Sequence, residues 1–244
     1  MHIIPLTTIG EVVPGEDLAG LLRRALTEEG LTLEPGDIIV VTQKIVSKAE
    51  GRFEDLDGVL PGAEALRLAE ITRKDPRLVE LVLRESTAVL RAVPHVLITR
   101  HRLGFVMANA GIDRSNIGGG GGERALLLPL DPDGTAGRLR AALGCAVVIS
   151  DSFGRPWRMG VTAVGIGAAG LPALLDRRGD LDRDGRVLEV TQIAVADLLA
   201  SAAALVTGEG RESIPAVLVR GLALTGPDRP AAALARPLEE DLFQ

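Results

Sequence analysis

The amino-acid sequence predicts an α+β fold, and three observations support this prediction. Apolar runs of strand length and helical patterns alternate without the regular strand–helix repeat of a parallel α/β protein. The 244 residues and the 46% hydrophobic content allow one large domain or two modest lobes around a sizeable core. No internal repeat or long linker interrupts the chain before its C-terminal part.

The N-terminal part of the chain contains the clearest element patterns. Residues 2–6 predict a first strand, and residues 17–29 have the apolar spacing of a helix that ends near Gly30. The β-branched run over residues 38–42 predicts a buried strand. Residues 61–72 and 76–84 predict two helices with proline in a first turn, and we expect these helices to pack as a pair.

Shorter elements follow in the rest of the chain. Apolar runs predict strands over residues 96–99, 105–108, 146–150, 161–166 and 216–219. A turn at 131–134 precedes a predicted helix over 138–143, and an Ala/Leu-rich helix is predicted over 193–206. Proline, alanine and charged residues dominate after Gly221, so residues 223–244 are predicted to be a C-terminal tail or the start of a truncated linker.

Composition and charge exclude several classes of function. The chain has 33 acidic and 27 basic residues, and its net charge of −6 gives no general attraction to nucleic acid or to an anionic membrane. With 2% aromatic residues and no tyrosine, it lacks a stacking platform for single-stranded nucleic acid. The three histidines lack metal-ligand spacing, and no Gly-x-Ser-x-Gly motif is present. Small-molecule partners are therefore favoured.

The single cysteine and the absence of a targeting segment indicate a cytoplasmic protein. Cys145 cannot form an internal disulfide and begins an apolar run, so we expect it in the core. The sequence has no signal peptide and no uninterrupted apolar span of about 18 residues.

Two segments place a carboxylate after an apolar, strand-like run. Residues 105–116 contain Asp113 and Asn116, and residues 145–158 contain Asp151 and Ser152. A strand that delivers an oxygen ligand to its exposed end, with Gly or Asn to turn the backbone, is typical of a site for a hard metal and phosphate. Alternatively, each Asp only satisfies local backbone donors at an ordinary strand-to-turn junction.

Lysine is scarce, which gives the remaining lysines weight. Of the 27 basic residues only Lys44, Lys48 and Lys74 are lysines. The compact ammonium groups of Lys44 and Lys48 suit phosphate where a planar guanidinium would be too large. The alternative is a strand end with solvated lysines.

Two glycine-rich segments match nucleotide-binding patterns only superficially. The run 118–122 is followed by Glu123, Arg124 and Ala125 where a P-loop needs Lys and then Ser or Thr, so a flexible loop is predicted. Residues 165–170 fit the Gly-x-Gly-x-x-Gly dinucleotide pattern, but Pro172 and a charged segment follow in place of a helix. Close backbone packing is the favoured reason for these glycines.

Five ordered motifs resemble one known family, the coenzyme F420:γ-glutamyl ligases. The motifs are Gly-Asp-Ile-Ile-Val-Val (36–41) with Ser-Lys-Ala-Glu-Gly-Arg (47–52), Lys-Asp-Pro-Arg-Leu-Val-Glu (74–80), Asn-Ala-Gly-Ile-Asp-Arg-Ser-Asn (109–116), Asp-Ser-Phe-Gly-Arg-Pro-Trp-Arg (151–158), and Gly-Glu-Gly (208–210) with Pro-Ala-Val-Leu-Val-Arg-Gly (215–221). The resemblance covers residues 5–222. It implies that residues 1–222 form one catalytic unit with an α+β, two-lobed fold that interlocks with a second copy in a homodimer.

The resemblance also implies the site residues. Asp113, Asp151, Ser152 and Glu209 would hold Mg²⁺ or Mn²⁺, with two ions sharing the site and K⁺ as a further candidate, and Asp113 and Asp151 would be catalytic. The residues that would contact GTP are Ile9, Gly10, Glu11, Val12, Gln43, Lys44, Lys48, Asn116, Thr207, Gly208, Glu209, Gly210, Arg211, Glu212, Ser213 and Ile214. Lys44 and Lys48 are expected to bind the phosphates and neutralise their charge. Arg155 and Arg158 are candidates to bind phosphate or the substrate carboxylate.

The activity implied is formation of an amide between L-glutamate and the terminal carboxylate of the deazaflavin precursor F420-0. GTP would activate that carboxylate as an acyl phosphate, and GDP and phosphate would leave. Two departures stand out: Gln43 replaces the small hydroxyl residue frequent in relatives, and the five-glycine run is longer than usual. Two rival functions remain at this stage, a catalytically inactive GTP-binding relative and a dinucleotide-dependent oxidoreductase built on residues 165–170.

Overall fold

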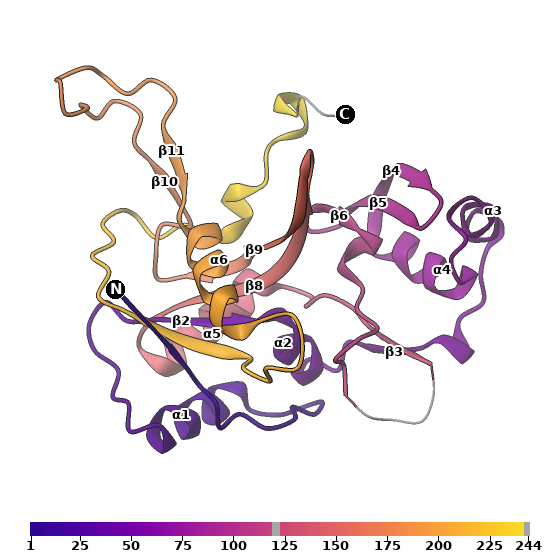
Figure 1. Cartoon of the computed structure of the whole chain (residues 1–244), viewed down its shortest axis with the longest axis horizontal. Coiled ribbons are helices and arrows are strands. Elements are labelled where there is room, and N and C mark those ends of the chain that lie inside the picture. Colours follow the sequence, from indigo (N-terminus) through magenta and orange to yellow (C-terminus); the bar gives the residue numbers. More distant parts are fainter. Residues whose placement is uncertain (119–122, 242–244) are drawn as a thin grey trace.

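The chain folds around a five-stranded mixed sheet with the strand order β1-β12-β2-β8-β9 (Figure 1). The computed structural model describes residues 1–118 and 123–241. The sheet strands are β1 (His2–Pro5), β2 (Ile38–Thr42), β8 (Ala146–Arg155), β9 (Arg158–Ala169) and β12 (Ala216–Arg220). β2 and β8 pair in parallel and the other neighbours are antiparallel, so the predicted α+β class is confirmed.

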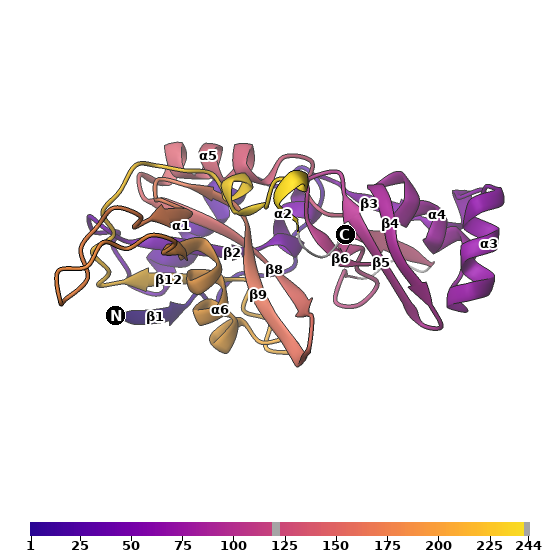
Figure 2. The same ribbon diagram turned by 90° about the horizontal axis from the view of Figure 1, so that it is seen from above.

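Helices cover both faces of this sheet because side chains alternate between the faces along each strand. Ile39, Val41, Val147 and Ile149 face a core shared with α1 (Leu18–Glu28), α2 (Gln43–Ala49) and α5 (Pro132–Leu143). Their neighbours in β2 and β8 face α6 (Val195–Thr207). Figure 2 shows α5 and α6 on opposite sides of the strands.

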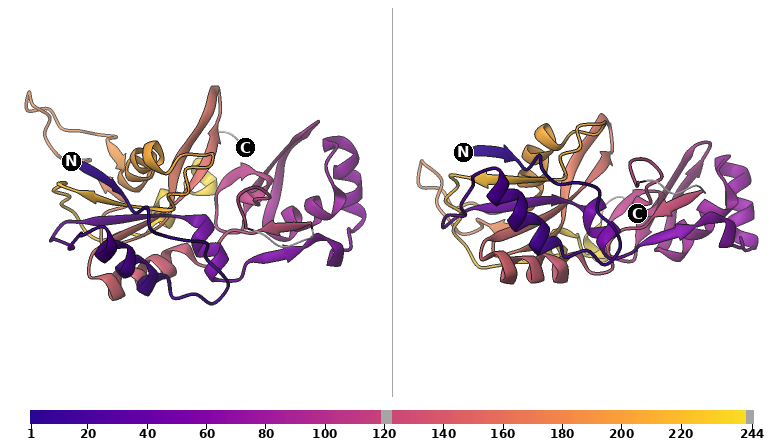
Figure 3. Two further views of the ribbon diagram at one scale, coloured as in Figure 1. Left: turned by 60° about the horizontal axis from the view of Figure 1, so that its bottom comes forward. Right: turned by 90° about the horizontal axis from the view of Figure 1, so that it is seen from below.

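A second region with its own core lies at the far end of the elongated molecule (Figure 3). It contains α3 (Ala63–Thr72) and α4 (Pro76–Arg84), the sheet β4-β5-β6 (Ser86–Val93, Val96–His101 and Val106–Ala108), and the pair β3-β7 (Phe53–Asp55 and Arg124–Leu126). α4 begins at Pro76 because Asp75 accepts the Arg77 N–H and proline fits the first turn. The predicted packing of α3 against α4 is confirmed.

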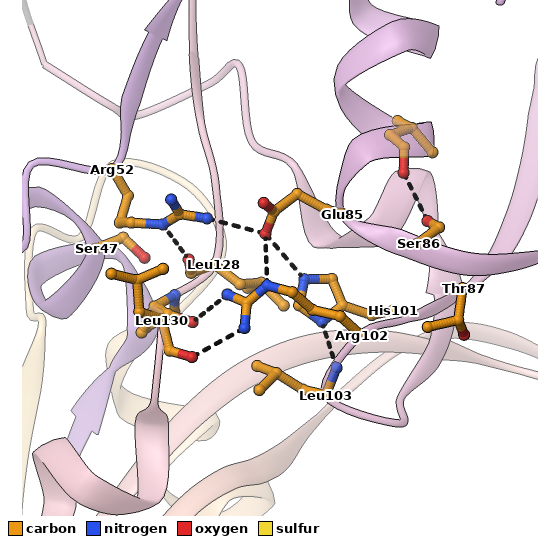
Figure 4. Close-up of polar contacts among 12 residues, drawn as sticks. Ser47, Arg52, Glu85, Ser86, Thr87, His101, Arg102, Leu103, Leu128 and Leu130 are labelled. Atoms are coloured by element: carbon orange, nitrogen blue, oxygen red, sulfur yellow. Dashed lines mark hydrogen bonds and ion pairs between the residues drawn. The ribbon is translucent and has the colours of Figure 1, made fainter.

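An ionic network connects α4 and β5 with the chain between α2 and β3 (Figure 4). Glu85 Oε2 accepts hydrogen bonds from Arg52 Nη2 at 2.9 Å and Arg102 Nε at 3.2 Å, and His101 Nε2 lies 3.4 Å away. Arg102 also donates to the carbonyl oxygens of Pro129 and Leu130. These contacts join the second region to the segment that follows α2.

Residues 165–170 belong to β9 and its end, and they do not form a strand-to-helix turn. A Cβ atom on Gly165 would lie 2.6 Å from Ala196 Cβ, and one on Gly167 would lie 2.5 Å from the carbonyl oxygen of Pro132. The prediction that these glycines permit close backbone packing is confirmed. The five-glycine run lies outside the described residues except for Gly118.

The C-terminal segment packs against β9 through residues 231–234, and Asp241 forms an ion pair with Arg100 of β5. Asp133 at the start of α5 accepts hydrogen bonds from the backbone N–H groups of Ala168, Ala231 and Ala232. Ala231 is fully buried in the short helix η3 (Ala231–Leu234), and η4 (Leu238–Glu240) follows. Asp133 therefore ties this segment to β9.

Several element predictions were wrong in detail. The predicted turn at 131–134 is the first turn of α5, which Asp131 caps by accepting the Gly134 N–H. Residues 43–49 form a helix, whereas no element was predicted there, and β4, β10 (Leu174–Asp176) and β11 (Gln192–Ala194) were not predicted. Cys145 is buried, as predicted. Within the part of the chain that is described, every helix is too short or too polar to cross a bilayer.

Candidate active site

A cavity of about 520 Å³ lies where α2, the β8–β9 hairpin and the loop after α6 meet. Seventeen of the predicted site residues line it: Ile9, Gly10, Glu11, Val12, Gln43, Lys44, Lys48, Asn116, Asp151, Ser152, Thr207, Gly208, Glu209, Gly210, Arg211, Ser213 and Ile214. A volume of this size accommodates a small-molecule ligand. Segments that are far apart in the sequence thus meet at one site.

α2 brings the two lysines to the cavity wall. β2 ends at Thr42, whose N–H donates to the carbonyl oxygen of Pro215, and the helix starts at the next residue. Lys48 lies one turn after Lys44, so both side chains project from the same side of the helix. The alternative of a strand end with solvated lysines is wrong, because Lys48 is only 5% exposed.

Lys48 has an acidic partner in the N-terminal segment of the cavity. Its Nζ lies 2.6 Å from Glu11 Oε1, while the Glu11 side chain is itself 59% exposed. The same carboxylate covers Gly118, where a Cβ atom would lie 2.3 Å from Glu11 Oε1. An incoming anion would have to displace this exposed carboxylate to reach the Lys48 ammonium.

Asp113 lies behind the lysine helix and does not itself line the cavity. β6 ends at Ala108, and left-handed backbone at Asn109, Ala110 and Gly111 redirects the chain before Asp113 pairs with Leu126. The strand-end placement predicted for Asp113 is therefore wrong. Its Oδ2 accepts a 2.7 Å hydrogen bond from Gln43 Nε2, and its Oδ1 lies 3.7 Å from Lys44 Nζ.

Asp151 occupies the middle of β8, so its predicted position at a strand end is also wrong. The strand continues to Arg155 because β9 pairs with it along the whole hairpin. Burial raises the pKa of Asp151 to about 7, and the nearby Asp113 carboxylate adds to the effect. Burial also raises the pKa of Asp113, against the lowering influence of Lys44 and Gln43. The two carboxylates thus repel each other in a poorly solvated place.

The loop after α6 supplies the third carboxylate. Glu209 accepts a hydrogen bond from Ser152 Oγ, and its charge contributes to the raised pKa values of both Asp113 and Asp151. Asn116 Nδ2 donates to the carbonyl oxygen of Gly210 at 3.1 Å and so joins this loop to the Asp113 segment. Glu212 does not line the cavity; it accepts the Gly210 N–H at 2.8 Å.

This set of donors fits a hard divalent cation in its chemistry. Three mutually repelling carboxylates and a hydroxyl are the oxygen ligands that Mg²⁺ and Mn²⁺ prefer, and a bound cation would relieve the repulsion. Among the described residues, no three acidic, histidine or cysteine side chains converge tightly enough to form a complete metal cluster. Ligation by all three would therefore need side-chain adjustment, which the exposed Glu209 can make most easily.

Comparison with known proteins decides the family. The model of the F420-0:Gamma-glutamyl ligase family matches residues 7–221. The chain belongs to the F420-0:gamma-glutamyl ligase family. It is 47% identical over 241 residues to the coenzyme F420:L-glutamate ligase of Methanothermobacter thermautotrophicus, covering 94% of this chain and 93% of the relative.

Other similar ligases cover the chain to a comparable extent. The coenzyme F420:L-glutamate ligase of Methanopyrus kandleri is 44% identical over 255 residues, which cover all of this chain and 98% of the relative. That of Natronomonas pharaonis is 46% identical over 226 residues, covering 90% of this chain and 86% of the relative. The resemblance inferred from the five motifs is therefore confirmed.

The sequence analysis missed some residues that line the cavity, and some of its candidate residues lie outside the cavity. The cavity wall also includes Thr42, Ile45, Gly118, Ser150, Ala163, Ala204 and Pro215. Ser150 directly precedes the motif 151–158, and this position could have indicated it, whereas nothing in the sequence marks Ala163 or Ala204. Arg155 and Arg158 flank the tip of the β8–β9 hairpin and do not line the cavity.

Proposed function

We propose that this chain is a GTP-dependent ligase that joins L-glutamate to the terminal carboxylate of F420-0 and adds further γ-linked glutamates. The observation that carries this proposal is the shared cavity, which two lysines line together with Asp151 and Glu209, while Asp113 lies next to Lys44 and close enough to raise the pKa of Asp151. Relatives named coenzyme F420:L-glutamate ligase, 44% and 47% identical over nearly the whole chain, supply the reaction and the substrates. The proposed product is an amide made at the expense of GTP.

The chemistry follows from the poor reactivity of a carboxylate toward an amine. An oxygen of the F420-0 carboxylate attacks the γ-phosphorus of GTP, the bond to the bridging oxygen breaks, and GDP leaves. The glutamate amine then attacks the acyl carbon, a C–N bond forms, and phosphate and one proton are released. Lys44 and Lys48 bind the phosphates and lower the cost of the negative charge.

Asp113, Asp151, Ser152 and Glu209 would hold Mg²⁺ or Mn²⁺ in this reaction. When bound, these cations supply Lewis-acid neutralisation of the phosphate charge. The protein positions the reacting groups and excludes competing water, which matters because an acyl phosphate is readily hydrolysed.

We also propose that the catalytic unit is two-lobed and acts as a homodimer, as the family resemblance implies. The hydrophobic clusters on the two faces of the central sheet and the separate cluster of the second region are consistent with two lobes. The oligomeric state is tested by sedimentation or by light scattering of the purified protein: a mass twice that of the 25.6 kDa chain supports the dimer, and the mass of a single chain contradicts it.

One assay distinguishes the ligase from the two rivals. Purified protein is mixed with GTP or ATP, Mn²⁺ or Mg²⁺, glutamate and F420-0, and GDP release and product mass are followed. A ligase releases GDP over many turnovers only when both other substrates are present, and its product gains the mass of one or more glutamate residues. GTP binding without turnover would favour the inactive relative. The glycines on which the oxidoreductase alternative depends lie in strand β9, where Gly165 and Gly167 pack against Ala196 and Pro132. They therefore do not form a dinucleotide-binding turn.

A further inference from the structure

Two buried polar side chains of α2 form a chain of hydrogen bonds to the Asp113 carboxylate. Gln43 is 2% exposed and Ser47 is fully buried, one helical turn further along α2. Ser47 Oγ donates to Gln43 Oε1 at 2.9 Å, and Gln43 Nε2 donates to Asp113 Oδ2 at 2.7 Å. Gln43 reaches the cavity wall, but Ser47 does not.

The two contacts fix the position of the glutamine amide from both ends. An ionised carboxylate only accepts hydrogen bonds, so Asp113 must face the NH₂ end of Gln43. The Ser47 hydroxyl then holds the carbonyl end. Without that hydroxyl, the buried Gln43 carbonyl would lose the hydrogen bond from Ser47, which favours rearrangement of the side chain.

This arrangement has a directional effect on Asp113. Gln43 engages Oδ2, while Oδ1 lies 3.7 Å from Lys44 Nζ. One carboxylate oxygen is thus held by the Gln43 amide and the other is presented toward the Lys44 ammonium. Removing a hydrogen-bond partner that orients a metal ligand in this way typically lowers metal affinity roughly 10–100-fold.

We propose that Gln43 and Ser47 are positioning residues that orient Asp113 for a divalent cation, and that Gln43 acts through this carboxylate and not through the nucleotide. The inference rests on the metal site of the proposed function. It replaces the expected GTP contact of Gln43 with a structural relay from Ser47 through Gln43 to Asp113. Such a relay gives a physical reason for a long amide at position 43, because a short hydroxyl side chain there would not span both contacts.

The test measures Mn²⁺ binding by electron paramagnetic resonance on the full-length protein without nucleotide or deazaflavin substrate. We expect Ser47→Ala to weaken Mn²⁺ binding about tenfold and Ser47→Thr, which keeps a hydroxyl, to restore most of it. GTP affinity without metal should stay within twofold of the wild type in Ser47→Ala. The matched control is Ser86→Ala, which removes a hydroxyl that also bonds one helical turn back, to the Val82 carbonyl oxygen at 2.6 Å. Its Mn²⁺ affinity should be unchanged.

A double-mutant cycle keeps the test decisive if one variant is unstable. Gln43→Met removes the amide with little change in length, so adding Ser47→Ala to it should weaken Mn²⁺ binding no further. Additive losses in the cycle, or Mn²⁺ affinity in Ser47→Ala equal to that of Ser86→Ala, would overturn the relay.

The outcome also separates this inference from the proposed function. If the protein is an active ligase and Ser47→Ala leaves its Mn²⁺ affinity unchanged, only the relay is refuted. Mn²⁺ binding that follows the expected pattern in a protein without ligase activity contradicts only the proposed reaction. A wild-type protein that binds no Mn²⁺ refutes both.

Discussion

Replacing Glu85 by Gln is expected to weaken the junction between the two regions of the molecule. The Glu85 side chain is only 12% exposed and faces Arg52, Arg102 and His101. Burial would raise the pKa of Glu85, but the nearby His101 imidazole and the charges of Arg52 and Arg102 outweigh it and lower the pKa from 4.5 to about 2. The ionised form is therefore strongly favoured in the folded protein.

The size and pH dependence of the effect follow from this pKa. A lowering from 4.5 to about 2 corresponds to about 3 kcal/mol of stability at neutral pH. Because the folded pKa lies below the unfolded value, this contribution is complete above pH 4.5 and is lost as the pH falls toward 2. Glu85→Gln should therefore cost about 3 kcal/mol at pH 7 and progressively less in acid.

Urea unfolding followed by circular dichroism, at pH values from 7 down to 3, measures the difference. The control is Glu64→Gln, whose pair with Arg67 is more than half exposed on both sides, so its stability should match the wild type within error. A Glu85→Gln protein as stable as the control at pH 7, or a loss of the same size at every pH, would refute this account.

Three further changes test the cavity and the packing. Glu11→Gln should tighten GTP binding up to about fivefold in calorimetry, because the exposed Glu11 competes with phosphate for Lys48; weaker binding would contradict that competition. Gly167→Ala should lower the free energy of unfolding by about 2 kcal/mol, because the new Cβ atom would meet the Pro132 carbonyl oxygen. The control is Gly137→Ala in α5, where no atom outside the adjacent residues and the helix backbone lies within 4 Å of the new Cβ atom; it should raise the free energy of unfolding by about 0.5–1 kcal/mol. Equal effects in chemical denaturation would argue against the close approach. Asp133→Ala should release the C-terminal segment, so that chymotrypsin cleaves after Leu234 faster than in the wild type, as identified by mass spectrometry. An unchanged rate would show that other contacts hold the segment.

Local sequence signals predicted the central elements well where one physical cause dominates. The β-branched run gave β2 its observed bounds, and a capping Asp with proline in the first turn did the same for α4. α2 was missed because it is a single short helix that starts directly after a strand. β4 was missed because most of its residues are exposed, so neither a buried run nor an alternating pattern marks it.

The site was predictable in its residues and less so in its geometry. The scarcity of lysine identified Lys44 and Lys48, and the motifs identified both Asp residues. Only the fold shows that Gln43 meets Asp113 across 70 positions of sequence. Local patterns placed both Asp residues at strand ends. In the structure, Asp151 lies within a strand extended by its hairpin partner, and Asp113 follows a left-handed turn. Pairing between distant segments, which no local pattern encodes, determines both positions.

Diffraction from crystals grown with Mn²⁺ and a non-hydrolysable GTP analogue tests the central claim most directly. At the manganese edge, anomalous peaks are expected within about 2–2.5 Å of oxygens from Asp113, Asp151, Ser152 and Glu209, with the triphosphate beside Lys44 and Lys48. Loss of these peaks in crystals of Asp151→Asn would agree with the ligand role. Manganese bound away from these side chains, or a nucleotide in another part of the molecule, would contradict the account.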